Sequence, residues 1–212
     1  MAHDTDTPGA TREPEYVSRG GHKLAAALDA FGVDPAGRAC ADLGCSTGGF
    51  TDCLLRRGAS AVYAVDTAYG ELAWTLRNDP RVTVMERTNA LHADPPDGAG
   101  VTLVAIDLGW TPMSKALPAA ARWLDRGGEI VALLKPQYED PISPAAPRAA
   151  GARTLDDQRS ERVARDRVAT LRAEGWDVAD PIASPVRGGA RRKGGKGAGN
   201  IEWLTLVRIA TP

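Results

Sequence analysis

Two shortages in this sequence exclude whole classes of protein: it has few cysteines and no long apolar run. The three cysteines, Cys40, Cys45 and Cys53, are an odd number within one short segment and include no CxxC pair. We therefore expect reduced thiols in a cytoplasmic protein rather than a disulfide framework. No apolar stretch approaches the ~20 residues that a membrane-spanning helix needs, and the polar N-terminal sequence is unlike a signal peptide.

An excess of charge is also missing. The 26 lysines and arginines against 27 aspartates and glutamates leave a formal net charge of -1, so any attraction to nucleic acid must come from a local cluster. The three histidines are scattered and no His/Cys cluster predicts a metal site. The 212 residues suit one domain with one core. We expect residues 1–15 to be a disordered lead and residues 16–212 to form a single domain.

Strands alternate with helices along the chain. We expect strands at residues 38–44, 61–66, 82–86, 101–108, 129–135, 176–185 and 201–209, and helices at 20–33, 49–59, 71–80, 114–128 and 155–175. This alternation is typical of a parallel sheet in a three-layer α/β sandwich. The last two strands are separated by a loop alone, so they can pair as an antiparallel hairpin. A mostly parallel sheet ending in such a hairpin is the Rossmann-like fold of S-adenosylmethionine-dependent methyltransferases.

A glycine-rich turn, "ADLGCSTGGF", follows the first predicted strand. Its glycines allow close approach to a ligand, and the amides of Ser46 to Gly49 would point at an anion near the helix N-terminus. The spacing is not GxGxxG, which argues against a dinucleotide. Asp66 ends the second strand, where a carboxylate can accept from ribose hydroxyls. A plain strand–helix turn and a helix cap are the alternatives, but loop and acid together favour a nucleoside cofactor.

Lys135 ends an unbroken apolar run, Ile130–Leu134, which is typical of a strand buried on both faces. A lysine in that position lies at the edge where open α/β sheets bind their ligands. The alternative is a lysine whose ammonium reaches out from the strand end into water. The segment that follows, residues 141–153, is rich in Pro and Ala and is predicted to be a loop.

An ordered set of motifs makes nearly the whole chain similar to a known family. The stretches "YVSRGGHKLAAAL", "DLGCSTGGFTDCLLRRGA", "VYAVDTAYGELAWTLRNDPRV", "ERTN", "LLKPQYE" and "GNIEW" resemble successive motifs of the TlyA-type rRNA methyltransferases, in the FtsJ-like superfamily of RNA ribose 2′-O-methyltransferases. The resemblance implies S-adenosylmethionine as cofactor and ribosomal RNA, or a ribosomal subunit, as partner. It implies a catalytic Lys-Asp-Lys-Glu tetrad at Lys23, Asp107, Lys135 and Glu202. The expected cofactor-binding residues are Asp42, Gly44, Ser46, Thr47, Gly48, Gly49, Phe50, Asp66, Thr67, Asn89 and Asp107.

The predicted topology supports three members of the tetrad independently. Asp107 and Lys135 end parallel strands, and an antiparallel last strand would bring Glu202 to the same edge. Topology does not place Lys23, which by itself is typical of a solvated helix lysine. A ribose 2′-hydroxyl must lose its proton as the methyl group arrives. We therefore expect burial and the nearby Lys23 to lower the pKa of Lys135, so that it can act as a general base. Asp107 and Glu202 are expected to orient its ammonium and to balance the charge of the site.

A basic loop, residues 187–200, lies beside the predicted active edge and contains no acidic residue. Such a run is often solvated surface, but its position here favours contacts with RNA phosphates. The expected RNA-binding residues are Arg19, Arg187, Arg191, Arg192, Lys193 and Lys196.

Two features depart from the family. Members usually begin with a small RNA-binding module, whereas this chain begins with a short polar lead, and the motif after the fourth strand, usually near Asp-Val-Ser-Phe, reads "DLGW". Trp110 in that motif could stack on a base or belong to the core. The leading hypothesis is an RNA ribose 2′-O-methyltransferase acting on ribosomal RNA. A small-molecule methyltransferase and a non-catalytic RNA-binding protein are the alternatives, and membrane lysis, implied by the family's older name of hemolysin, has no support in the sequence.

Overall fold

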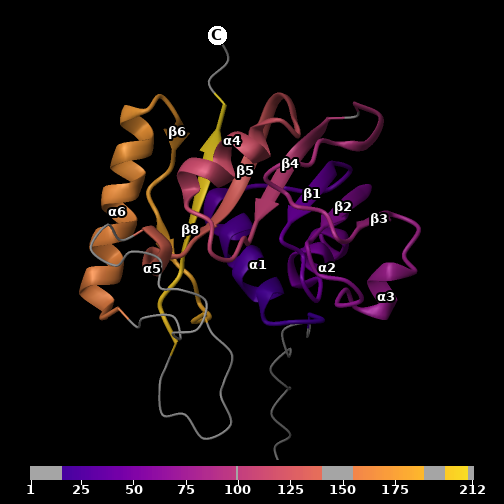
Figure 1. Ribbon diagram of the computed structural model, residues 1–212, viewed down its shortest axis with the longest axis horizontal. Helices are drawn as coiled ribbons and strands as arrows, with labels where there is room; N and C mark the ends of the chain where they lie inside the picture. The colour runs from indigo at the N-terminus through magenta and orange to yellow at the C-terminus, as the bar shows by residue number, and fades with distance from the viewer. Residues whose placement is uncertain (1–15, 99, 140–154, 189–198, 210–212) are drawn as a thin grey trace, which may run out of the picture.

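Strand β4, Val101–Ile106, lies at the centre of a mixed sheet with the strand order β3-β2-β1-β4-β5-β8-β6 (Figure 1). The computed structural model describes residues 16–98, 100–139, 155–188 and 199–209. The other strands are β1 Ala39–Leu43, β2 Ala61–Val65, β3 Val82–Met85, β5 Leu124–Leu134, β6 Asp177–Val178, β7 Ile182–Ala183 and β8 Trp203–Arg208. The helices are α1 Gly20–Phe31, α2 Gly49–Arg56, α3 Trp74–Arg77, α4 Met113–Ala121, α5 Pro136–Glu139 and α6 Asp157–Ala173, with a 3-10 turn at Pro96–Gly98.

The pairing of the strands confirms the predicted fold. Strands β1 to β5 pair in parallel, whereas β8 runs antiparallel to β5, β6 and β7. The strand predicted at 176–185 is therefore split in two, and between its halves lies Pro181, which has no N–H to donate to a ladder. The hairpin itself is confirmed.

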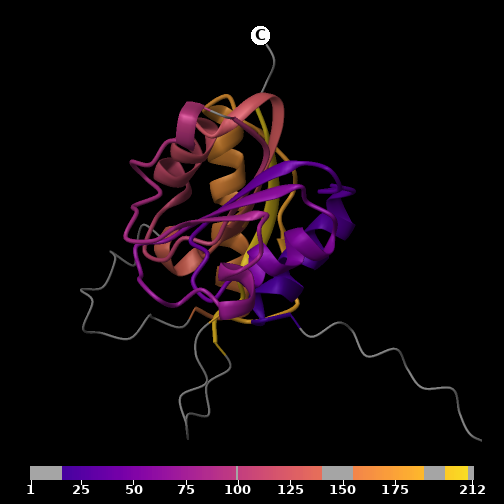
Figure 2. The ribbon, with the colours of Figure 1, turned by 90° about the vertical axis from the view of Figure 1, so that its right-hand side faces the viewer.

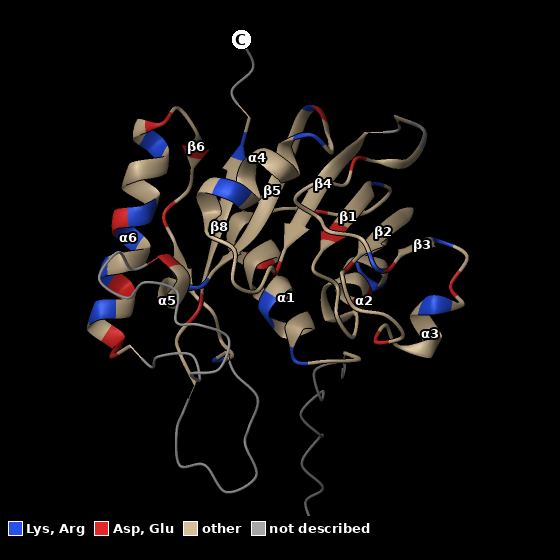
Figure 3. Ribbon diagram, viewed as in Figure 1, with Lys and Arg blue, Asp and Glu red and all other residues tan. Residues whose placement is uncertain are grey.

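Helices cover both faces of the sheet, as the three-layer prediction requires (Figure 2). One core lies between the sheet and helices α1 and α2, and includes Leu24, Leu28 and Leu54. The other lies beneath α4 and α6, and includes Leu117 and Val168. Because helices pack on both sides, the central strands are apolar on both faces. Helix α6 keeps acidic and basic residues along its length on the outside (Figure 3).

Two predicted helices are wrong in length. Helix α3 begins at Trp74 rather than near residue 71, because Ala73 is extended and its N–H donates to the Thr47 carbonyl in the glycine-rich turn. Helix α4 ends at Ala121 rather than near residue 128, because Leu124 already pairs with β4 as the first residue of β5. Helix α5 was not predicted, and the loop predicted at 141–153 lies outside the described residues.

Candidate active site

Several strand ends meet at one edge of the sheet, and all four residues of the predicted tetrad lie there. Asp107 and Lys135 directly follow the parallel neighbours β4 and β5. Strand β8 begins opposite the last residue of β5, which brings Glu202 to the same edge. Lys23 comes from α1, which packs against β8. The tetrad's convergence is therefore present in the fold, and the catalytic role of its members stays a prediction.

The four side chains form two ion pairs. Lys135 Nζ lies 2.5 Å from Asp107 Oδ1, and Lys23 Nζ lies 2.5 Å from Glu202 Oε2. Lys23 and Glu202 are only 8% and 4% exposed, so Lys23 is not a solvated helix lysine. Gly188 leaves room for this second pair, because a Cβ at that position would collide with the Glu202 carboxylate. Lys135 is paired rather than extended into water, which removes the alternative interpretation of its position.

The expected lowering of the Lys135 pKa is wrong for the protein itself. Burial lowers the pKa of this ammonium, but Asp107, by its charge and its hydrogen bond, together with Glu202 and Tyr138, raises it further. The net pKa of Lys135 is above its ordinary value. The prediction gave Asp107 and Glu202 the role of orienting the ammonium and balancing the charge. It failed because the attraction of these carboxylates for the Lys135 ammonium outweighs its burial.

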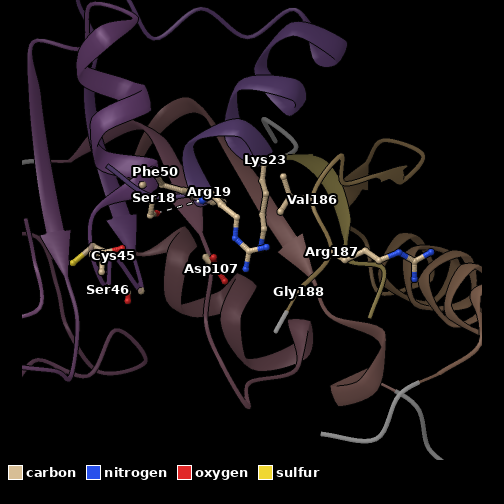
Figure 4. A pocket seen from close by; sticks show the side chains of 14 residues that line it. Ser18, Arg19, Lys23, Cys45, Ser46, Phe50, Asp107, Val186, Arg187 and Gly188 are labelled. Atoms are coloured by element: carbon tan, nitrogen blue, oxygen red, sulfur yellow. Dashed lines mark hydrogen bonds between the residues drawn. The ribbon is translucent and has the colours of Figure 1, made fainter. Parts of the chain in front are cut away.

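A pocket of about 260 Å³ lies beside the tetrad (Figure 4). Lys23 and Asp107 reach it from α1 and β4, and the side chains of Lys23 and Arg19 extend toward Asp107. Of the predicted cofactor-binding residues, the pocket is lined by Gly44, Ser46, Thr47, Gly49, Phe50 and Asp107. The pocket is also lined by Ser18, Cys45, Val186 and Gly188, which were not predicted from the sequence. Ser18 and Cys45 lie within the motifs that resemble the family, and Gly188 lies in the basic loop, so the sequence offered a signal for these three.

The glycines of the turn are required by close packing at the pocket. Gly44 has φ +96°, and a Cβ there would lie 2.5 Å from the Asp107 carbonyl oxygen. A Cβ on Gly49 would lie 2.9 Å from the Gly21 nitrogen, at the start of α1. Only glycine fits at both positions. The turn therefore packs closely against the segments that carry Lys23 and Asp107.

The prediction that the amides of Ser46 to Gly49 point at an anion is wrong for two of them. The Ser46 N–H donates to Asp66 Oδ2 at 2.8 Å, and the Gly48 N–H donates to the Cys45 carbonyl. Asp66 also accepts from the Ala68 N–H at 2.8 Å, within its own loop. It is not the helix cap that the alternative interpretation held, because the next helix, α3, has Ala73 at its N-cap and no side-chain cap. The same carboxylate joins the ends of β1 and β2, next to the pocket.

Five predicted cofactor residues do not line the pocket: Gly48, Asp66, Asp42, Thr67 and Asn89. Asp42 is fully buried, where one carboxylate oxygen accepts from both the N–H and hydroxyl of Thr51. Burial raises the pKa of Asp42 to about 7, and its role in the fold is to hold the start of α2 against β1. Thr67 and Asn89 are exposed, and Asn89 accepts from the Leu91 N–H within its own turn.

The predicted RNA-binding residues have different positions. Arg19 lines the pocket. Arg187 turns its guanidinium away from Asp107 (Figure 4) and makes two hydrogen bonds to Asp157, at 3.0 and 2.9 Å. Arg191, Arg192, Lys193 and Lys196 lie outside the described residues.

Trp110 is not a core tryptophan. It is 49% exposed, has a left-handed backbone with φ +60°, and lies over Tyr138 with ring centroids 5.0 Å apart. Trp110 belongs to the segment that follows Asp107, and its ring is exposed there.

The described residues contain neither a candidate metal site nor a helix that could span a membrane. No group of three or more His, Cys, Asp or Glu side chains there is arranged to hold a metal ion. Within the same residues, no helix has the length and apolar character to cross a bilayer.

Known proteins resemble this chain over most of its length. A model of the FtsJ-like methyltransferase family matches residues 16–181. The 16S/23S rRNA (cytidine-2'-O)-methyltransferase TlyA of Mycobacterium tuberculosis is 42% identical over 200 residues, which are 94% of this chain and 70% of the relative. YqxC of Bacillus subtilis, named as a candidate rRNA methyltransferase, is 40% identical over 89% of this chain and 64% of its own.

A solved structure shares the fold as well. A protein from Lactococcus lactis, named as a candidate hemolysin, is 35% identical with a TM-score of 0.76, over 91% of this chain and 88% of its own. The strand order, the tetrad at the sheet edge and these matches agree, and the chain belongs to the FtsJ-like family of S-adenosylmethionine-dependent methyltransferases.

Proposed function

We propose that this protein transfers a methyl group from S-adenosylmethionine to a ribose 2′-hydroxyl of ribosomal RNA. The observation that carries the proposal is the pairing of Lys135 with Asp107 and of Lys23 with Glu202 at one edge of the sheet, beside a pocket. The relative from Mycobacterium tuberculosis is named for the same reaction on 16S and 23S rRNA.

The pocket fits the cofactor that the family uses. Gly44 and Gly49 bring no side chain to it. Asp66 directly follows the neighbouring strand β2, where a ribose would be bound. Ser46, Thr47 and Phe50 provide polar and apolar contacts on the same wall. S-adenosylmethionine supplies the methyl group and, as a sulfonium, a positive charge that lowers the pKa of a nearby ammonium.

In this proposal, Lys135 accepts the 2′-hydroxyl proton as its neutral amine. Its ammonium is held by Asp107, so its position is fixed before the RNA arrives. Since the pKa of Lys135 is raised in the protein, the neutral amine is the minor form at neutral pH. A nearby positive charge lowers this pKa and so increases the fraction of neutral amine. Glu202 is held by Lys23, so its carboxylate contributes to the field around Lys135 without binding it directly.

The RNA would approach across the mouth of the pocket. Arg19 lies at this mouth, and Trp110 offers an exposed ring next to Asp107. An arginine can contact a phosphate and an aromatic face can stack on an unpaired base. A small-molecule methyltransferase would need neither feature.

Product analysis tests the proposal. Purified protein is incubated with ribosomal subunits and labelled S-adenosylmethionine, and the RNA is digested to nucleosides. We expect the label in a 2′-O-methylnucleoside, and none with Lys135→Ala. Label in a base methyl group would contradict the proposal, and RNA binding without transfer would favour the non-catalytic alternative.

A further inference from the structure

A buried glutamate outside the tetrad, Glu139, joins the segments that carry Lys135 and Asp107 by a hydrogen bond and also pairs with Arg167 of α6. Glu139 ends α5, the helix that starts directly after Lys135, and its side chain is only 1% exposed. Its Oε1 accepts from the Met113 N–H at 2.6 Å. Its Oε2 lies 2.7 Å from Arg167 Nε of α6, as an ion pair rather than a well-aligned hydrogen bond.

Met113 belongs to the segment that Asp107 begins. It is the first residue of α4, whose first turn has N–H groups without partners in the helix. Pro112, at the N-cap, has no side-chain acceptor, so the N-terminus of α4 has no side-chain cap hydrogen bond of its own. Glu139 supplies the acceptor from another segment, with its negative charge at the positive end of the helix dipole. One hydrogen bond therefore closes the segment after Asp107 onto the segment after Lys135.

The rings of Trp110 and Tyr138, in contact at a tilted angle of 39°, bridge the same two segments. The Lys135–Asp107 contact lies at the strand ends from which both segments start. Glu139 itself does not line the pocket beside the tetrad.

Stability is a weak explanation for this buried charge. The cost of desolvating a carboxylate and a guanidinium can exceed their attraction, so apolar replacements of such pairs are often neutral or stabilising. The hydrogen bond to Met113 fixes the distance between the two segments, and the pair with Arg167 holds the Glu139 side chain against α6.

We propose that Glu139 is a positioning residue: it holds the Lys135 and Asp107 segments at the separation at which ammonium and carboxylate meet. The effect on geometry stands on the contacts above. The effect on turnover rests on the proposed function as well.

The pKa of Lys135 measures this geometry without any activity. The groups that raise the pKa of its ammonium are Asp107, Glu202 and Tyr138. Lys23 is ion-paired with Glu202. If Glu139→Ala lets Asp107 withdraw, the pKa of Lys135 falls, as followed by alkaline NMR titration of labelled lysine with Lys135→Arg as the assignment control. Glu139→Gln keeps the volume and the acceptor for Met113, so we expect a smaller fall. If Glu139→Ala does not fold, Glu139→Gln carries the test.

Glu129→Ala is the matched control. Glu129 lies in the middle of β5, the strand that leads to Lys135, and pairs there with Arg38 and Arg208. Removing it deletes ion pairs without touching either catalytic segment, so the pKa of Lys135 should not move.

Kinetics give the second readout. A misplacement of about 1 Å can cost about 100-fold, so Glu139→Ala should lose kcat on that scale while KM for RNA and affinity for S-adenosylhomocysteine stay unchanged. An unchanged pKa of Lys135 and an unchanged kcat in a folded Glu139 variant would overturn the inference. If the wild type transfers no methyl group to RNA, the proposed function fails, and the NMR titration still decides the positioning role.

Discussion

Replacing Lys135 with arginine separates the two roles that a lysine can have at this edge. Lys135→Arg keeps a positive charge for Asp107, but arginine stays protonated in proteins and cannot act as a base. Lys135→Ala removes both charge and base. If the amine accepts the 2′-hydroxyl proton, both variants should lose about 100- to 10,000-fold in rate. If charge alone matters, arginine should restore most of the rate.

The raised pKa of Lys135 sets the pH dependence. Even at its ordinary pKa of about 10.4, lysine is about 0.1% neutral amine near pH 7.4, and the Asp107 pair lowers that fraction further. Because kcat/KM reports the free enzyme, it should rise about tenfold per pH unit through the neutral range without a plateau. A profile of kcat would level off earlier if the cofactor's positive charge lowers the pKa in the complex.

The assay is transfer of labelled methyl groups to ribosomal subunits by wild type and both variants, within the pH range where melting curves show folded protein. Calorimetry with S-adenosylhomocysteine controls for the pocket, which should keep its affinity. Near-wild-type turnover of Lys135→Arg, or a flat pH profile of kcat/KM, would refute the general-base assignment.

Three other substitutions test the rest of the site. Asp66→Ala should weaken binding of S-adenosylhomocysteine in calorimetry, since Asp66 also holds the Ser46 amide; preferential binding of NAD would contradict the cofactor assignment. Gly44→Ala should lower thermal stability, by about 1–3 kcal/mol for the strained backbone alone, because φ is +96° and the Cβ would lie 2.5 Å from the Asp107 carbonyl; a native melting temperature would show that this packing is dispensable. Replacing Arg191, Arg192 and Lys193 with alanine should flatten the salt dependence of RNA binding by roughly one unit of slope per lost phosphate contact; an unchanged slope would mean that the run is solvated surface.

The fold could be predicted because its signals are local. Apolar runs such as Ile130–Leu134 and the alternation of strands with helices specify a sheet buried on both faces. Once the topology is known, Asp107, Lys135 and Glu202 must share an edge. Lys23 needed the family resemblance, because α1 precedes the first strand and no pairing rule places it.

The electrostatics of the site could not be predicted in the same way. The pKa of Lys135 depends on which carboxylate lies nearest to which ammonium, and those distances arise from packing between α1, β4, β5 and β8. The bond from the Met113 N–H to Glu139 likewise joins residues 26 apart. A four-residue α5 gives no periodic signal in the sequence, and the extended start of the α3 segment is set by its contact with the glycine-rich turn.

Mapping of ribose methylation across ribosomal RNA tests the central claim most directly. RNA is compared from cells with the gene, cells without it, and cells that carry Lys135→Ala. We predict a 2′-O-methyl group present with the wild-type gene and absent in both other cases. Identical ribose methylation in all three would contradict the account.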